Sequence, residues 1–151
     1  MTSETERTLA ECKRRGWTVE KTEYWLPSFR VHDVAKFAKS YVDNPTTPNR
    51  EELSLAVSYH KAAPGIRKDL FGFVDVLALT PDGFLAIQST SRPNIGTRHL
   101  KIRTQCMDAA RAWLRAGGHI EVWGWRKEKV AVDRKFWQVK VRPVIWEDVT
   151  T

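Results

Sequence analysis

The sequence predicts an α/β domain in which helices flank a mixed central β-sheet. Segments typical of helices and strands follow each other along the 151 residues in the order helix, strand, insertion, two strands, helix, two strands. The chain is 42% hydrophobic and 11% aromatic, which is enough for one core without disulfides. Thr80-Pro81-Asp82-Gly83 forms a turn between two apolar runs and indicates antiparallel pairing. We therefore expect a single domain over 1–151, with an insertion at about 29–66.

The N-terminal half predicts one helix, one strand and the insertion. Capping residues and acids precede an apolar pattern that ends at a glycine, which favours a helix over about 4–15. Aromatic and β-branched residues predict a strand within 17–27, which stops at a proline. In the insertion, helical spacing over 34–41 and alternation over 53–57 predict a short helix and a strand, separated by a loop at 44–49.

The C-terminal half supplies most of the expected sheet. The runs 71–79 and 84–90 predict the two strands of a β-hairpin around the Pro-Gly turn. Apolar residues at helical spacing predict a helix over about 97–115, ended by two glycines, whose apolar stripe packs on the sheet. The runs 120–125 and 136–141 predict two more strands.

Charge and cysteine usage narrow the class of partner. The net charge is +7 and the pI about 9.6, which favours a polyanion, of which nucleic acid is the usual one. The two cysteines have no metal-ligand or disulfide spacing and fit a reducing cytosol. The N-terminal residues contain no apolar run, and no stretch is long enough to span a membrane. We expect a cytoplasmic protein.

A carboxylate inside an apolar strand is the main anomaly of the sequence. Asp75 lies between Val74 and Val76, and burying it is costly unless a metal, a donor or water compensates it. Gln88 and Thr90 share one face of the return strand, which the hairpin brings beside Asp75. The alternative is a structural ion pair between Asp75 and one of two basic residues, Arg67 or Lys68.

At these residues the chain resembles the PD-(D/E)XK nuclease superfamily, and within it most the archaeal-type Holliday junction resolvases. That family has a glutamate on a first helix, an aspartate that opens a hairpin strand, and Glu-x-Lys on the return strand. Glu6-Arg7 with the exit at Gly16-Trp17, Asp75–Ala78 and Leu85–Thr90 carry the resemblance, which covers most of the chain outside the insertion. It implies an α-β-β-β-α-β core and a metal-dependent endonuclease that cuts branched DNA, such as four-way junctions, as a homodimer. The resemblance also implies the cytoplasm of a bacterial, archaeal or phage-infected cell.

The resemblance implies a site for Mg²⁺ or Mn²⁺ made by Asp75, Gln88, the Ser89 carbonyl and Glu6. Gln88 stands in the family's acidic position, and its amide oxygen supplies a ligand without the charge, so metal affinity should fall. Glu6 has an alternative role as an acid that stabilises the helix dipole. Glu11, further along the same helix, is a second candidate for the family's glutamate.

Thr90 stands where the family has its lysine, so a cation near the attacking water has to come from elsewhere. Arg98 and Lys101 lie beside the apolar stripe of the helix at 97–115 and are the candidates. Their alternative role is contact with the DNA backbone. His60 and Asp69 flank the hairpin and are interpreted as solvated loop residues.

Basic residues on both sides of the hairpin are the expected DNA contacts. They are Lys13, Arg14, Arg15, Arg67, Lys68, Arg92, Arg98, Lys101 and Arg103. The first three also fit a solvated helix end. No sequence-reading motif is found, so recognition of DNA shape is expected. Two alternatives to an endonuclease stay open: a catalytically inactive DNA-binding module of the same fold, and a protein-interaction or toxin-like domain.

Overall fold

The computed structural model describes residues 2–27, 38–62 and 65–150, and for 24–27, 55–62 and 65–67 it describes the backbone alone. The chain divides into two compact units. One unit is formed by Met1–Glu23 together with Asp69–Thr151, and the other by Tyr24–Lys68. Each unit is described by itself.

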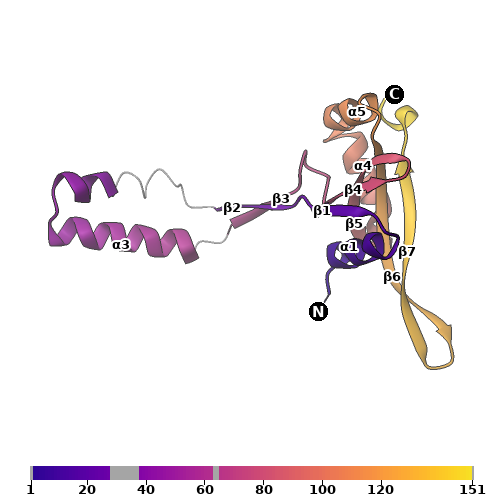
Figure 1. The fold of residues 1–151 in the computed structure, drawn as a ribbon, viewed down its shortest axis with the longest axis horizontal. Helices are drawn as coiled ribbons and strands as arrows, with labels where there is room; N and C mark the ends of the chain where they lie inside the picture. Colours follow the sequence, from indigo (N-terminus) through magenta and orange to yellow (C-terminus); the bar gives the residue numbers. More distant parts are fainter. Residues whose placement is uncertain (1, 28–37, 63–64, 151) are drawn as a thin grey trace. The chain divides into compact units, whose positions relative to one another are not determined.

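The first unit contains a five-stranded sheet with strand order β1-β4-β5-β6-β7 (Figure 1). Its strands are β1 (Thr18–Lys21), β4 (Val76–Thr80), β5 (Gly83–Ser91), β6 (His119–Ala131) and β7 (Arg134–Val144). Its helices are α1 (Glu4–Arg14), α4 (Ile95–Arg103), α5 (Met107–Arg115) and the short 3₁₀ helices η1 (Arg92–Asn94) and η2 (Trp146–Val149). Only β5 and β6 are parallel, and the other neighbours are antiparallel. The expected α/β class with a mixed sheet flanked by helices is confirmed.

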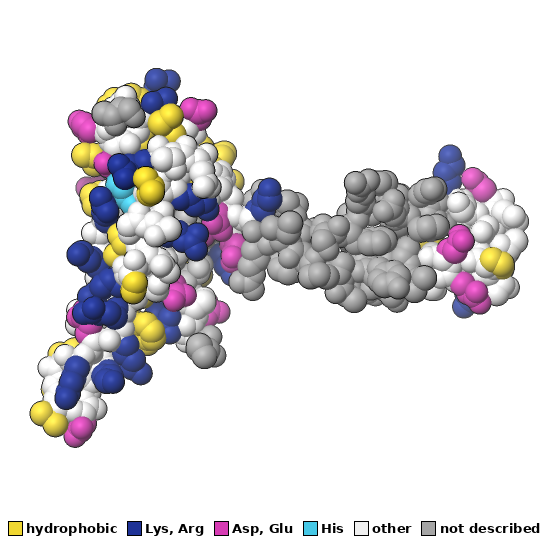
Figure 2. Space-filling model, turned by 180° about the vertical axis from the view of Figure 1, so that it is seen from behind, with side chains coloured by type: hydrophobic (Ala, Val, Ile, Leu, Met, Phe, Trp, Pro, Cys, Tyr) yellow, Lys and Arg dark blue, Asp and Glu magenta, His cyan; other side chains and the backbone are white. Residues whose placement is uncertain are grey.

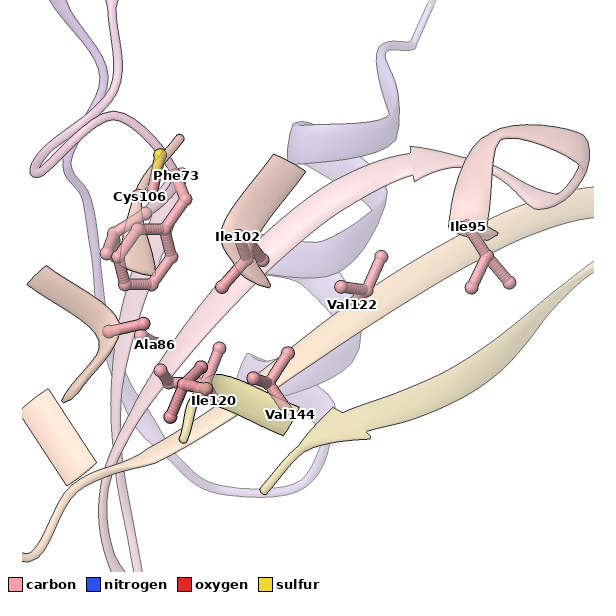
Figure 3. Packing of buried hydrophobic residues seen from close by; sticks show 11 residues of the cluster. Phe73, Ala86, Ile95, Ile102, Cys106, Ile120, Val122 and Val144 are labelled. Carbon is pink, nitrogen blue, oxygen red and sulfur yellow. The ribbon is translucent and has the colours of Figure 1, made fainter. Parts of the chain in front are cut away.

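The two faces of this sheet carry different core layers. Alternate residues of a strand point to opposite faces. Ile87 packs in a cluster with Cys12 of α1, whereas its neighbour Ala86 packs in a cluster with Ile102 of α4 and Ala110 of α5. Figure 3 shows this second cluster from close by. Helix α1 therefore covers one face, and α4 with α5 cover the other.

The predicted central hairpin is present as β4 and β5, but its first strand begins later than expected. Val76 pairs with Ile87, and the turn residue Gly83 pairs with Thr80. The predicted strand residues 71–74 instead lie in a tight turn, because Phe71 has a φ of 56° and Gly72 a φ of 82°. Consecutive left-handed residues reverse the chain, and glycine accepts this conformation without steric cost.

The predicted helix at 97–115 is interrupted. Helix α4 ends at Arg103 and α5 begins at Met107. The Thr104 hydroxyl donates to the Leu100 carbonyl at 2.8 Å, a side-chain bond that competes with regular helix geometry. At the break Cys106 is buried against Gly72, where an added Cβ atom would lie 3.2 Å from the sulfur. The break therefore brings Cys106 against the turn that precedes β4.

The last two strands are longer than the apolar runs that predicted them. Strand β6 extends to Ala131 and β7 begins at Arg134, so the two form a hairpin with an irregular register between Lys129 and Ala131. Asp133 at its turn has a φ of 68°. Figure 1 shows the hairpin extending past the other strands of the sheet. Sequence patterns missed this extension because its residues are mostly polar on both faces.

The second unit contains a two-stranded antiparallel sheet of β2 (Tyr24–Pro27) and β3 (Gly65–Lys68), and helix α3 (Thr47–Ala62). Residues 38–43 are helical, and the rest of the predicted helix at 34–41 lies outside the described residues. The predicted strand at 53–57 is wrong, because it lies inside α3. Thr46 accepts the Asn49 N–H with its hydroxyl and Pro48 occupies the first turn, both of which favour a helix start. None of the described helices has the length and apolarity that a membrane span requires.

Candidate functional site

Asp75 is held in place immediately before β4. Its side chain is 6% exposed, and its Oδ2 atom accepts two hydrogen bonds of 2.7 Å, from Gln88 Nε2 and from the Ser89 backbone N–H. Its backbone is fixed as well: the Asp75 N–H donates to the Ile87 carbonyl, and the Asp75 carbonyl accepts the Thr22 N–H. The carboxyl group therefore has a defined orientation at the sheet.

Gln88 presents an acceptor that has no partner. The residue is 2% exposed, and its Nε2 atom is used by Asp75. Its Oε1 atom is buried and accepts no hydrogen bond from the residues that the structure describes. Buried polar atoms are nearly always paired, so this oxygen indicates a place for a donor or a cation.

Asp69 is the residue that sequence reasoning missed. It lies in a loop and is partly buried, and the interpretation as a solvated loop residue overlooked its place beside Asp75. An isolated bridge pairs Leu70 with Val74, so the tight turn places Asp69 opposite Asp75. Burial, together with a hydrogen bond to Asp69 and the charge of Asp69, raises the pKa of Asp75 to about 8, against the lowering effect of its two donors. Glycine at position 72 was the available signal, because it marks the turn.

Asp75 and Gln88 point to the face covered by α4 and α5, and α1 lies on the other face. Ile87 and Ser89, the residues on either side of Gln88, belong to the α1 side. The Ser89 hydroxyl donates to Thr8 of α1 at 2.8 Å. The expected carbonyl ligand Ser89 thus contributes its backbone N–H to Asp75 and its side chain to α1.

The acids of α1 have other partners. Glu6 forms a capping box with Ser3: its carboxylate accepts the Ser3 N–H at 2.9 Å, while the Ser3 hydroxyl accepts the Glu6 N–H. The bond from the Ser3 N–H lowers the pKa of Glu6. Glu11 binds Arg14 and Arg15, and these bonds lower its pKa to about 2. In the described part of the chain, neither acid is hydrogen-bonded to Asp75 or Gln88.

The expected cations lie on α4, on the same side of the sheet as Asp75. Arg98 and Lys101 line a hollow of about 240 Å³, together with Thr97, Leu100, Thr104 and Gln105. Burial raises the pKa of Cys106, which the charge of Lys101 lowers and that of Asp69 raises. Lys101 and Asp69 are therefore both close enough to act on one thiol. Thr90 is buried on the face of Gln88 and brings no charge there.

The residues around Asp75 fit a divalent cation. Among the described residues, no three His, Cys, Asp or Glu side chains gather as a metal site. The donors here are instead two carboxyl groups and one amide oxygen, from Asp75, Asp69 and Gln88. Oxygen ligands of this kind, completed by water, suit Mg²⁺ or Mn²⁺. The unpaired Gln88 oxygen and the raised pKa of Asp75 are the two features that a bound cation would remove.

The basic residues expected to contact DNA have several environments. Arg92 is paired with Glu128 and donates to the Gln138 carbonyl, and Arg14 and Arg15 are paired with Glu11. Lys13 and Lys68 are exposed, Arg103 is partly buried, and the side chain of Arg67 lies outside the described residues. Arg67 and Lys68, the basic residues of the ion-pair alternative, belong to the other unit, so that alternative stays open.

Comparisons with protein-family models, curated proteins and solved structures find no match to this chain. The function of the site therefore has to be argued from its geometry and charge.

Proposed function

We propose that this chain is a metal-dependent DNA endonuclease that acts on branched DNA, with its active site around Asp75. The observation that carries the proposal is the group of buried Asp75 and Gln88 with partly buried Asp69, in which an acid with a raised pKa lies beside an unpaired oxygen. Perturbed acids gathered in one place are typical of catalytic and metal sites.

The arrangement of the first unit supports the same proposal. Helix α1 precedes three antiparallel strands, β1, β4 and β5, and a helical segment then leads to β6, which is parallel to β5. This is the α-β-β-β-α-β order that the resemblance to PD-(D/E)XK nucleases implies. Asp75 precedes β4 and Gln88 lies on β5, as that pattern requires.

Each residue of the site has a defined part in the proposed reaction. Asp75, Asp69 and the Gln88 amide oxygen would hold a divalent cation, which supplies an activated water and neutralises charge on the scissile phosphate. Gln88 Nε2 and the Ser89 N–H orient the Asp75 carboxylate. Lys101 and Arg98 supply positive charge from α4, in place of the lysine that Thr90 replaces.

A second candidate function is a DNA-binding module of the same fold that has lost cleavage. Two observations favour it: Thr90 occupies the lysine position, and Glu6 serves as a capping acid. Under this alternative the Asp75 group is a structural remnant, and the positive charge of the chain still favours nucleic acid.

Cleavage of a labelled four-way junction, with matched linear duplex and with Mg²⁺, Mn²⁺ or EDTA, tests the proposal. The wild type should nick the junction with metal, and Asp75→Asn and Asp69→Asn should abolish nicking while leaving binding intact. Glu6→Gln is the control and should cut normally. A wild type that binds and never nicks establishes the second candidate, and an Asp75→Asn variant that cuts at the wild-type rate refutes the site.

The proposed enzyme acts as a homodimer, because resolving a junction needs two opposed cuts. Exposed apolar residues just after β7 offer a surface for a second copy: Ile145 is 50% exposed and Trp146 40%. Sedimentation of the protein alone and with junction DNA measures this state. A monomer at all concentrations, with a single bound copy per junction, would contradict it.

A further inference from the structure

The β6–β7 hairpin carries a concentration of positive charge that the proposed active site does not use. We call residues 126–142 the arm. It contains seven Lys or Arg residues and two acids, so it accounts for much of the net charge of +7. Figure 2 shows Lys and Arg side chains along this hairpin and hydrophobic side chains at its end.

Three lysines of the arm lie near one another without acidic partners among the described residues. Lys129 is directly opposite Lys135 in the ladder, a pairing that is destabilising by itself. Lys127, Lys129, Arg134 and Lys135 surround a hollow of about 560 Å³, in which Asp133 is the one acid. No ion pair is found for the three lysines among the described residues. A bound anion would offset the repulsion between these lysines.

The end of the arm is apolar and exposed. Val132 is 81% exposed and Val130 56%. Exposed valines add no hydrophobic stabilisation to the isolated chain. Apolar side chains at the end of a basic hairpin are suited to contact with the sugars and base edges of DNA. Near the base of the arm, Trp137 is 44% exposed and is stacked by the Arg7 guanidinium 3.5 Å from its ring centre.

We propose that the arm binds duplex DNA, with its lysines on phosphates and its valine end in a groove. The inference rests on the proposed function, since it names a DNA-contacting surface of the same enzyme. A two-stranded β-ribbon fits a DNA groove in width, and phosphates on both sides of a groove match basic residues on both strands of the ribbon. The sequence-based set of DNA contacts contains none of these residues.

Binding to labelled linear duplex in EDTA, followed by fluorescence anisotropy, tests the arm separately from cleavage. The arm variant is Lys127→Ala, Lys129→Ala and Lys135→Ala together. A matched control removes the same charge from other exposed positions, as Lys39→Ala, Arg50→Ala and Arg115→Ala. Each variant is first checked by thermal unfolding. A third variant, Val130→Ser with Val132→Ser, keeps the charge and removes the apolar end.

The arm variant should bind at least about tenfold more weakly, and its slope of log K against log salt should fall by about 2 to 3, because each lysine releases about one counterion. The control should lose much less. The valine variant should lose about tenfold in affinity with an unchanged salt slope.

Failure of the arm and failure of the proposed function give different results. If the wild type binds duplex and the arm variant binds as well with the same salt slope, the arm inference is overturned and cleavage is unaffected. If the arm variant changes only the oligomeric state, the arm is a protein contact and the inference is again overturned. If the arm matters for binding and the wild type never nicks junctions, the inference stands and the endonuclease proposal fails.

Discussion

The Asp75 site and the β6–β7 arm depart from ordinary protein patterns in opposite ways. The site places an ionisable and a polar group inside apolar layers, where Asp75 is 6% exposed and Gln88 2%. The arm places apolar groups in solvent, where Val132 is 81% exposed, and sets like charges against each other. Local choices that oppose folding are expected at functional positions, where a ligand compensates them. We propose that the ligand is a cation at the site and a polyanion at the arm.

The largest difference between the folded core and the arm should be in their contribution to stability. Replacing one tryptophan in each by alanine measures this difference. Trp123 is fully buried in β6 beneath α1, whereas Trp137 is 44% exposed on β7. Trp123→Ala should cost about 3 to 5 kcal/mol through lost burial and a cavity. Trp137→Ala should cost about 1 kcal/mol or less, which covers its contact with Arg7. Urea unfolding measures the loss in free energy of unfolding for each variant. Equal losses would contradict the view that the arm lies outside the folded core.

The metal-free site should make stability depend on pH. The pKa of Asp75 is raised to about 8 in the folded chain, from about 3.9 when unfolded. The stabilising contribution of the protonated group is therefore complete below about pH 4 and is lost as pH rises through about 8. Between these limits the wild type should lose up to about 1.4 kcal/mol per pH unit relative to Asp75→Asn in EDTA.

Chemical unfolding of both proteins across this pH range gives the difference directly. A constant difference between wild type and Asp75→Asn from low to high pH would show that Asp75 is charged in the folded protein, contrary to the account.

Much of the fold is predictable from local signals, and the site less so. Local signals formed the predicted elements: Ser3 caps the start of α1, Gly16 follows its end, and the Pro81–Gly83 turn joins β4 to β5. The apolar alternation over 53–57 wrongly predicted a strand, because the contacts at Thr46 that favour a helix start lie outside those five residues.

The site illustrates why proximity is harder to predict than secondary structure. Asp75 and Gln88 follow from hairpin register, and the structure confirms that they are in contact. Asp69 depends on a left-handed Phe71, a conformation that no sequence pattern marks for a phenylalanine. The contact between Gly72 and Cys106 requires the break in the predicted helix at 97–115. These features arise from tertiary packing, which outweighs local preference.

Restoring the acid of the family pattern should sharpen the metal site. Gln88→Glu adds a carboxylate beside Asp75 and Asp69, so it should destabilise the metal-free protein through repulsion and desolvation. It should also increase affinity for Mn²⁺ about tenfold, because ligand charge sets affinity for hard cations. Thermal unfolding with and without Mn²⁺ measures both effects. Gln138→Glu on exposed β7 is the control, and an equal response there would remove the case for a site at Gln88.

The smallest expected effect concerns α1. Ser3→Ala should cost about 1 kcal/mol, because it removes the hydroxyl that accepts the Glu6 N–H. Glu6→Gln should cost less stability than Ser3→Ala, since glutamine also completes a capping box. Urea unfolding reports the losses, and cleavage should be unchanged in both variants. A Glu6→Gln variant of normal stability that loses cleavage would return Glu6 to the active site.

Calorimetric titration with Mn²⁺ at pH 7, where Asp75 is mostly protonated, tests whether Asp75, Asp69 and Gln88 form one cation site. The wild type should bind Mn²⁺ at one site per chain and release a proton on binding, since the cation replaces the proton on Asp75. Asp75→Asn and Asp69→Asn should each abolish this binding, while Glu6→Gln should retain it. A wild type that binds no Mn²⁺, or variants that bind it as tightly as the wild type, would contradict the account.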